Sequence, residues 1–170
     1  MSDQSRRSEA AKGKPSMPEP QIVQRGAFLV AGLHYEGKNE HGEIPALWDN
    51  EFLPRIGELA GIRVGREAYG MMRVLPGVPA EQGFEYLASV EVRSLENLPR
   101  GMVGWEIPAQ TYAVLPAHDV PDLGRAFDDL YVRWLPQSGY EATDGPMFEL
   151  YPATYGQDLI IYVYAAVRRK

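Results

Sequence analysis

The sequence predicts an α+β fold in which a strand–helix–strand–strand unit occurs twice and both copies contribute to an antiparallel sheet. Three observations support this prediction. Two segments carry apolar residues at helical spacing, and several others alternate apolar and polar residues as strands do. Similar stretches also recur in the same order, namely "FLVAGL" and "YAVLPA", "FLPRIGEL" and "WLPQSGYE", and "MMRVLP" and "FELYPA". Their offsets of roughly eighty residues indicate an internal duplication.

The first copy begins with a predicted strand over residues 21–37, with a bulge near Gly26. A helix follows, and Pro54 is expected to end or kink it because proline lacks the backbone N–H. Residues 68–77 and 84–94 form the next two strands. The helix is predicted from apolar residues at helical spacing: Ile44, Leu47, Trp48, Phe52, Ile56 and Leu59.

The second copy repeats this order. An extended segment over residues 102–118 leads to a helix that starts near Asp119 and stops at Pro136. Residues 147–153 and 158–167 supply the last two strands. The helix has the stricter apolar rhythm of the two: Leu123, Ala126, Phe127, Leu130, Tyr131, Trp134 and Leu135.

The two copies are expected to join edge to edge, because each one alone would leave a face of its sheet exposed. We place both helices on one face of the joined sheet. A ligand pocket is then expected on the opposite, concave side, at the pseudo-two-fold seam between the copies.

Composition limits the classes of function. A chain of 170 residues is the size of one domain. The net charge of -6 argues against a nucleic-acid binder, and the lack of cysteine excludes disulfides and thiolate chemistry. Residues 1–20 hold no apolar run and are predicted to be a disordered leader, with the folded domain over 21–168. A cytoplasmic location and no membrane contact follow as expectations.

Standard motifs for metal or nucleotide binding are missing. His34, His41 and His118 lie far apart, and none has a second ligand at a familiar spacing. Glycine strings of the GxGxxG or GxxxxGK[ST] kind do not occur, and GxSxG is absent too. We therefore expect no metal and no cofactor.

One carboxylate stands out in the apolar stretch "MFELY". Strand alternation places Met147, Glu149 and Tyr151 on one face, which we take to be the pocket face, and Phe148 and Leu150 on the helix-covered face. A desolvated carboxylate is costly unless it is paired, so a cationic ligand is one explanation for Glu149. The same group could instead act as a general acid or base with a raised pKa. It could also lie in solvent, or pair with an arginine such as Arg73.

The chain has ten Tyr and three Trp, and aromatic rings attract cations. Trp48 and Trp134 lie on the predicted helices and are expected in the core. The aromatic residues on predicted strands are candidates for a cavity wall, and about half of them are expected to line it. They are Tyr86, Trp105, Tyr112, Tyr151, Tyr162 and Tyr164.

The motifs "WLPQSGYE" and "DGPMFELY", with "FEYLASVEV" upstream and the duplication, resemble the GyrI-like small-molecule-binding domain. This domain is also the effector-binding domain at the C-terminus of AraC-type and MerR-type regulators. The resemblance covers about residues 21–167. It implies a pocket at the pseudo-two-fold seam, with Glu149 as the strand glutamate that contacts cationic aromatic drugs. It also implies wall roles for Tyr86, Trp105 and Tyr151.

The resemblance leaves three functions open. The first is a stand-alone binding protein for a hydrophobic, cationic aromatic molecule, held by Glu149 with Tyr86, Trp105, Tyr112, Met147, Tyr151 and Tyr162. Similar stand-alone proteins hydrolyse cyclopropane-bearing electrophiles, which would make Glu149 catalytic. Others protect DNA gyrase, so gyrase or a separate regulator is a candidate protein partner. The roughly twenty residues before the domain are too few for a helix-turn-helix, so no direct nucleic-acid contact is expected.

Overall fold

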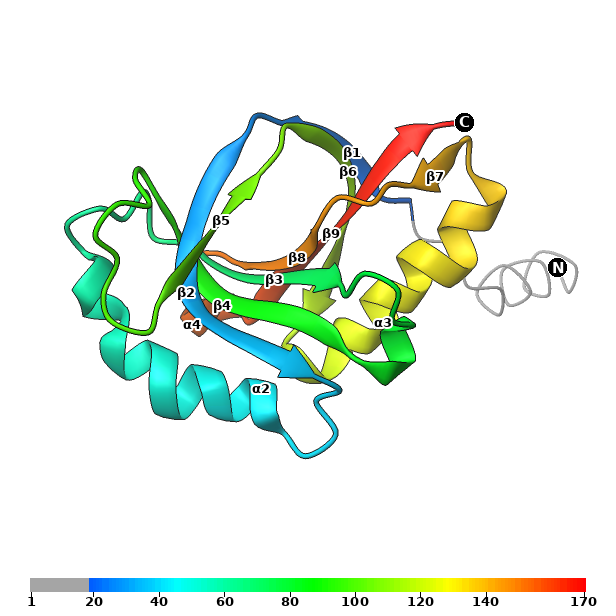
Figure 1. The fold of residues 1–170 in the computed structure, drawn as a ribbon. Coiled ribbons are helices and arrows are strands. Elements are labelled where there is room, and N and C mark those ends of the chain that lie inside the picture. Colours follow the sequence, from blue (N-terminus) through cyan, green and yellow to red (C-terminus); the bar gives the residue numbers. More distant parts are fainter. Residues whose placement is uncertain (1–18) are drawn as a thin grey trace, which may run out of the picture.

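The computed structural model describes residues 19–170, so the predicted leader lies almost entirely outside the described residues. Within them, nine strands form one antiparallel sheet with helical segments packed against it, as the sequence predicts (Figure 1). The order across the sheet is β1-β6-β9-β8-β3-β4-β2-β5, and β7 also pairs with β9. No helix of this part of the chain is long and apolar enough to cross a bilayer.

The strands are β1 (Gln21–Arg25), β2 (Phe28–Gly37), β3 (Ala68–Val74), β4 (Phe84–Val92), β5 (Val103–Ile107), β6 (Gln110–His118), β7 (Tyr140–Ala142), β8 (Met147–Tyr151) and β9 (Ile160–Arg169). The α-helices are α2 (Glu43–Ala46), α3 (Leu123–Asp128) and α4 (Tyr155–Asp158). Short 3₁₀ turns occur at Ala80–Gln82 and Val120–Asp122.

The duplication is visible in the strand pairing. At the seam, β3 pairs with β8, and Met71 lies opposite Phe148 at the centre. Strands β4 and β2 follow on one side of this pair, and β9 and β6 follow on the other. The two edge strands are exchanged: β1 precedes β2 in the chain but pairs with β6, and β5 precedes β6 but pairs with β2. Each half therefore completes the sheet of the other.

Both long helical segments change their helix type at equivalent positions. The first helical segment (43–59) passes from α2 through a π-helical turn, Leu47–Phe52, into a 3₁₀ turn, Leu53–Leu59. The second (123–137) does the same through Asp129–Trp134 and Leu135–Gln137. Each 3₁₀ turn begins with Leu-Pro, and the proline cannot donate a backbone hydrogen bond. The predicted interruption at Pro54 is thus confirmed.

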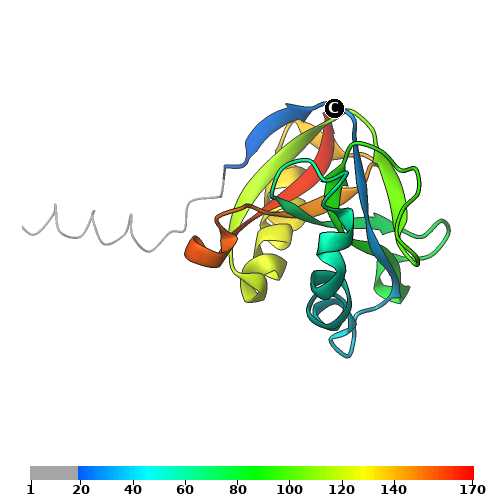
Figure 2. The same ribbon diagram turned by 90° about the vertical axis from the view of Figure 1, so that its left-hand side faces the viewer.

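The two helical segments pack against the same face of the sheet (Figure 2). Phe52 and Leu59 of the first segment pack on β2 and β4, and Leu130 of the second packs on β6 and β9. We call this side the helix face and the other side the open face.

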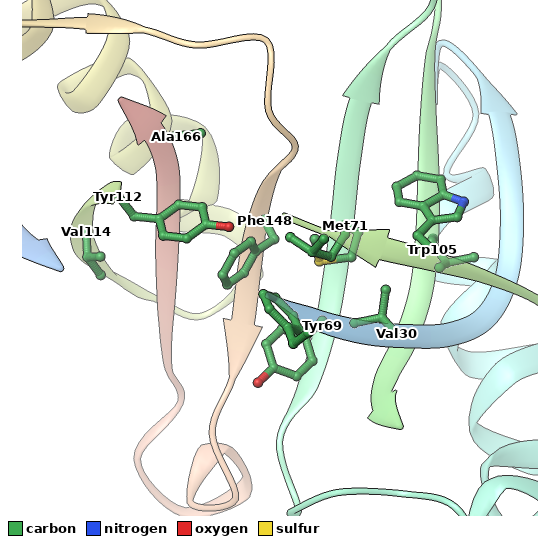
Figure 3. Packing of buried hydrophobic residues seen from close by; sticks show 11 residues of the cluster. Val30, Tyr69, Met71, Trp105, Tyr112, Val114, Phe148 and Ala166 are labelled. Atoms are coloured by element: carbon green, nitrogen blue, oxygen red, sulfur yellow. The ribbon is translucent and has the colours of Figure 1, made fainter. Parts of the chain in front are cut away.

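The centre of the open face is filled by side chains (Figure 3). Phe148 is fully buried there and stacks on Tyr164, with ring centroids 4.4 Å apart. Tyr112 and Phe28 contact Phe148 edge-on, and Trp105 belongs to the same cluster. The hollow predicted at the centre of this side is therefore occupied by an aromatic core.

Replacement of Phe148 by alanine should destabilise the protein strongly, because the cavity would open at the centre of this aromatic cluster. We expect a loss of about 3–5 kcal/mol in the free energy of unfolding, measured by urea denaturation. The control is Val132→Ala, since Val132 is 66% exposed and should change stability by less than about 0.5 kcal/mol. Equal losses in the two variants would contradict the assignment of Phe148 to the core.

Candidate functional site

Glu149 lies at the seam, on the helix face of β8, and only 6% of it is exposed. The hydroxyl groups of Tyr86 and Tyr151 donate hydrogen bonds to its Oε1 atom, at 2.5 and 3.0 Å. The indole Nε1 of Trp48, on the first helical segment, donates to the Tyr86 hydroxyl at 2.8 Å. Three aromatic side chains from two strands and a helix therefore hold one carboxylate in place.

A glycine makes room for this carboxylate. Gly70 of β3 is paired with Glu149 across the seam. A Cβ atom at position 70 would lie 2.5 Å from Glu149 Oε1 and closer still to the Tyr86 hydroxyl. Real Cβ atoms do not approach other atoms so closely, so any side chain at position 70 would displace the carboxylate or its donor.

Aromatic rings cover the carboxylate on the side away from the sheet. Trp48 lies 5.5 Å from the ring of Tyr151 and 5.5 Å from that of Phe52, between ring centroids. Tyr151 contacts Tyr155 of α4 edge-on at 5.2 Å. Such rings present negative faces that attract cations. Aromatic rings therefore form much of the cover of Glu149, and no side chain of residues 19–170 supplies a positive charge to it.

Burial raises the pKa of Glu149 to about 6, and the two tyrosine hydrogen bonds oppose this shift. Burial also raises the pKa of Tyr86 and Tyr151, and the nearby carboxylate adds to the effect. Both phenols therefore stay protonated and remain donors at neutral pH. No Lys, Arg or His side chain of residues 19–170 forms an ion pair with Glu149.

An apolar groove of about 270 Å³ lies on the helix face near the start of β8. Met147 lines it and is on the same face of β8 as Glu149. Tyr131 of the second helical segment covers Met147, and its hydroxyl lies 3.3 Å from the Met147 sulfur. The remaining lining residues come from β3, β4 and α3: Met72, Arg73, Val74, Phe84 and Phe127. The groove thus lies between the second helical segment and the strands at the seam.

The seven predicted site residues divide between the two faces of the sheet. Glu149, Tyr86, Met147 and Tyr151 come together on the helix face. Trp105, Tyr112 and Tyr162 are on the open face, where the first two are buried in the aromatic core. Tyr162 is 38% exposed and lines a separate cleft there.

The predicted orientation of β8 is wrong. Phe148 faces the open side, where it joins the aromatic core, and Leu150 packs against the same core. Glu149 consequently faces the helices. Alternation cannot decide this question, because β8 is at the middle of the sheet and both of its faces are covered. The suggested ion pair of Glu149 with Arg73 is also wrong, since Arg73 binds Glu85, with its Nε 2.6 Å from Oε2.

Sequence analysis misses the site roles of Trp48 and Gly70. Helical spacing places Trp48 in the core, and it does pack against the core of the first half. A buried indole N–H needs a hydrogen-bond acceptor, so a tryptophan at this position is a signal for a polar group beneath the helix. Nothing in the sequence around Gly70 indicates that it lies opposite Glu149.

The raised pKa makes Glu149 a source of pH-dependent instability. Its carboxyl group binds a proton more tightly in the folded state than in the unfolded state, where the value is 4.5. The folded state therefore loses stability as pH rises from below 4.5 through 6, by up to about 2 kcal/mol. Glu149→Gln should remove this loss. Compared with the natural chain, it should unfold at a similar urea concentration at about pH 4 and at a higher one at about pH 7.5.

Glu106→Gln is the matched control, because Glu106 is exposed on β5. This substitution should leave the urea concentration at the midpoint of unfolding close to that of the natural chain at both pH values. A Glu149→Gln variant that is equally or less stable at the higher pH would show that the buried carboxylate carries no unfavourable charge.

No three His, Asp or Glu side chains within residues 19–170 are arranged so that they could hold a metal ion.

Known proteins resemble this chain in sequence or in fold. The transcriptional regulator BrlR of Pseudomonas aeruginosa is 35% identical over 131 residues, which cover 76% of this chain and 47% of the regulator. The chain therefore spans about half the length of this curated relative.

Two solved structures have the same architecture. The structure of SAV2435 bound to tetraphenylphosphonium has a TM-score of 0.68 at 15% identity, over 89% of this chain and 94% of that one. An integron cassette protein from the mobile metagenome of Vibrio cholerae has a TM-score of 0.63 at 14% identity, over 88% and 96%. At these identities the likeness establishes a common fold.

Residues 21–167 match the family Cass2, described as integron-associated effector binding protein. This range covers all of the sheet except the last residues of β9. It agrees with the GyrI-like resemblance inferred from "WLPQSGYE" and "DGPMFELY". The chain belongs to the Cass2 family of GyrI-like, effector-binding proteins.

Proposed function

We propose that the protein binds a lipophilic, aromatic organic cation, and that the carboxylate of Glu149 pairs with its positive charge. The observation that carries this proposal is a buried carboxylate held by two tyrosine hydroxyls with no ion-pair partner in the described chain. A charge in such surroundings is costly, and proteins usually neutralise or pair it.

A cationic ligand would reverse the electrostatic cost. The hydrogen bonds from Tyr86 and Tyr151 converge on Oε1, and no side chain of residues 19–170 donates to Oε2. The second oxygen is therefore available to face a positive group. Because the surroundings exclude water, the attraction between the two charges is stronger there than at a surface. Rings such as Trp48 and Tyr151 add about 0.5–2 kcal/mol of cation–π attraction each.

The apolar groove gives room to the rest of the ligand. Met147 is two residues from Glu149 on the same face of β8, which corresponds to about 7 Å along a strand. A cation with apolar groups of that reach could extend from the carboxylate to Met72 and Tyr131 in the groove. The tetraphenylphosphonium in the SAV2435 structure is a cation of this kind, and it supports the choice of ligand class.

Access to Glu149 needs a movement of the side chains that cover it, since so little of the group is exposed. Trp48 belongs to the first helical segment and covers Glu149, and its side chain is held by one hydrogen bond to Tyr86. We infer that a ligand displaces the Trp48 ring. Part of the binding energy would then offset this displacement, so a weakly interacting cation would be excluded.

Hydrolysis of an electrophile is the second function that the sequence leaves open. A pKa of about 6 would suit a general base. Within the described residues, however, the groups closest to Glu149 are rings and phenols that already donate to it or to each other. We therefore favour binding. We do not assign the activity of the regulator BrlR to this protein, because the chain spans only about half the length of BrlR.

Glu149→Gln should weaken the binding of tetraphenylphosphonium at least about tenfold, because the charge is removed while the shape and the acceptor oxygen are retained. Isothermal titration calorimetry at neutral pH measures the effect. Triphenylphosphine oxide, a neutral molecule with three phenyl rings, should bind the two proteins with similar affinity. Glu106→Gln controls for the change in net charge. If tetraphenylphosphonium binds the Glu149→Gln variant as well as the natural protein, the charge-pairing proposal is refuted.

Binding of this permanent cation should also depend on pH. The carboxylate must be ionised to pair with it, so affinity should be nearly constant well above neutral pH and fall as pH drops through about 6. At about pH 5 we expect binding about tenfold weaker than the plateau, because about one molecule in ten is ionised. The Glu149→Gln variant should show a flat profile. A natural protein with the same flat profile would indicate that Glu149 does not take part.

A further inference from the structure

A second cleft, of about 530 Å³, lies on the open face of the sheet, beside the aromatic core. Strand β8 separates it from the Glu149 site, because Leu150 lines the cleft and Glu149 points to the other face. The lining residues come from several strands and the turn after β8: Gln21, Val23, Arg25, Glu67, Tyr69, Glu91, Val114, Leu150, Pro152, Tyr162 and Tyr164. Its volume is in the range of small-molecule sites.

The charges in this cleft leave one carboxylate in excess. Arg25 Nη2 binds Glu91 Oε1 at 2.8 Å and the Tyr69 hydroxyl at 2.9 Å, and its guanidinium lies 3.7 Å from the Phe28 ring centroid. Arg25 is therefore already engaged. Glu67 accepts a hydrogen bond from the backbone N–H of Arg66, but no Lys, Arg or His side chain of residues 19–170 forms an ion pair with it.

Part of the lining of the cleft is aromatic or apolar. Tyr162 is partly exposed, and Tyr164 stacks on Phe148 behind it. Leu150 lies beside Tyr162 in the register of β8 and β9. The lining therefore offers a ligand both aromatic side chains and the Glu67 carboxylate.

The first half of the protein shows what occupies the equivalent place. Arg73 of β3 and Leu150 of β8 occupy equivalent positions in the two halves, because each lies two residues after its member of the central pair, Met71 and Phe148. In the first half Arg73 is paired with Glu85 across β3 and β4, and its guanidinium lies 3.9 Å from the Trp105 ring centroid. In the second half the corresponding pair is Leu150 and Tyr162. The second half therefore has no charged pair at this position, although Arg25 of β1 lies on the rings of Phe28 and Tyr69 elsewhere in the same cleft.

We propose that the open-face cleft binds a small aromatic amidine or guanidine. Its planar cation would pair with Glu67, and its ring would rest against Tyr162, where the second half has no counterpart of the Arg73–Glu85 pair. Planar cations of this type form two parallel hydrogen bonds to a carboxylate and stack on aromatic faces. This site is separate from the one proposed around Glu149 and does not depend on it.

Three probes of one shape and different charge test the proposal: benzamidine, benzamide and benzoate. Because benzamidine is an aromatic cation and could enter the Glu149 site, all titrations use the full chain with Glu149→Gln, which keeps the two sites distinguishable. Binding is measured by calorimetry at neutral pH, and circular dichroism melting confirms that each variant is folded. We expect benzamidine to bind at least about tenfold more tightly than either benzamide or benzoate.

Two further substitutions, each added to the Glu149→Gln chain, test where benzamidine binds. Glu67→Gln should weaken benzamidine at least about fivefold, since it removes the charge and retains the shape. Leu150→Arg should abolish binding, because it places a guanidinium of the chain itself in the cleft beside Tyr162. The control is Glu51→Gln, an exposed residue of the first helical segment, which should change the affinity less than about 1.5-fold.

Benzamidine affinity that is unchanged by Glu67→Gln would overturn the proposal. Equal affinities for benzamidine and benzamide would overturn it too, because the charge would then have no role. A preference for benzoate would also overturn it, by showing that Arg25, and not Glu67, governs the cleft.

Discussion

The structure depends on the antiparallel pairing of β3 with β8, centred on Met71 and Phe148. This contact joins the two halves, and its register decides what lies on each face. Phe148 is at the centre of the aromatic core on the open face. One residue further along, Glu149 lies over Gly70 on the helix face. A shift of the register by one residue would turn the carboxylate toward the core and the phenyl ring toward the helices. The position of the site is thus fixed by packing on the opposite side of the same strand.

The candidate site keeps a group that is unfavourable for folding. Glu149 is buried, its pKa is raised by that burial, and it is held by tyrosines that must stay protonated to donate. An apolar residue would be less destabilising at this position. A carboxylate that the described chain leaves without a counter-charge is what a cation-binding site requires, because the ligand then supplies the missing interaction. In the proposed cation-binding role, stability and binding therefore make opposite demands on this residue.

The fold can be predicted from sequence to a large extent because it is repeated. The helical spacing from Ile44 to Leu59 and from Leu123 to Leu135, and the matching Leu-Pro at the end of each run, indicate two equivalent units. The identity of Glu149 as an unusual strand residue can also be recognised. Its orientation cannot, since Met147, Glu149 and Tyr151 are as well suited to a covered face as Phe148 and Leu150.

The separation of Trp105 and Tyr112 from Glu149 could not be predicted for a similar reason. An aromatic residue on a strand can fill a core or line a cavity, and the sequence does not distinguish the two. The contact of Trp48 with Tyr86 and the approach of Glu149 to Gly70 join residues far apart in the chain, so only the folded structure reveals them.

The exchange of β1 and β5 has a consequence for how the chain can be divided. A break between β4 and β5 would give one fragment holding β1 without its neighbour β6, and another holding β5 without its neighbour β2. Each fragment would expose unpaired backbone both at an edge of its sheet and at the seam. The repeat unit is therefore a unit of sequence but not of autonomous folding, and the two copies are interlocked in the manner of a strand-swapped dimer whose subunits share one polypeptide.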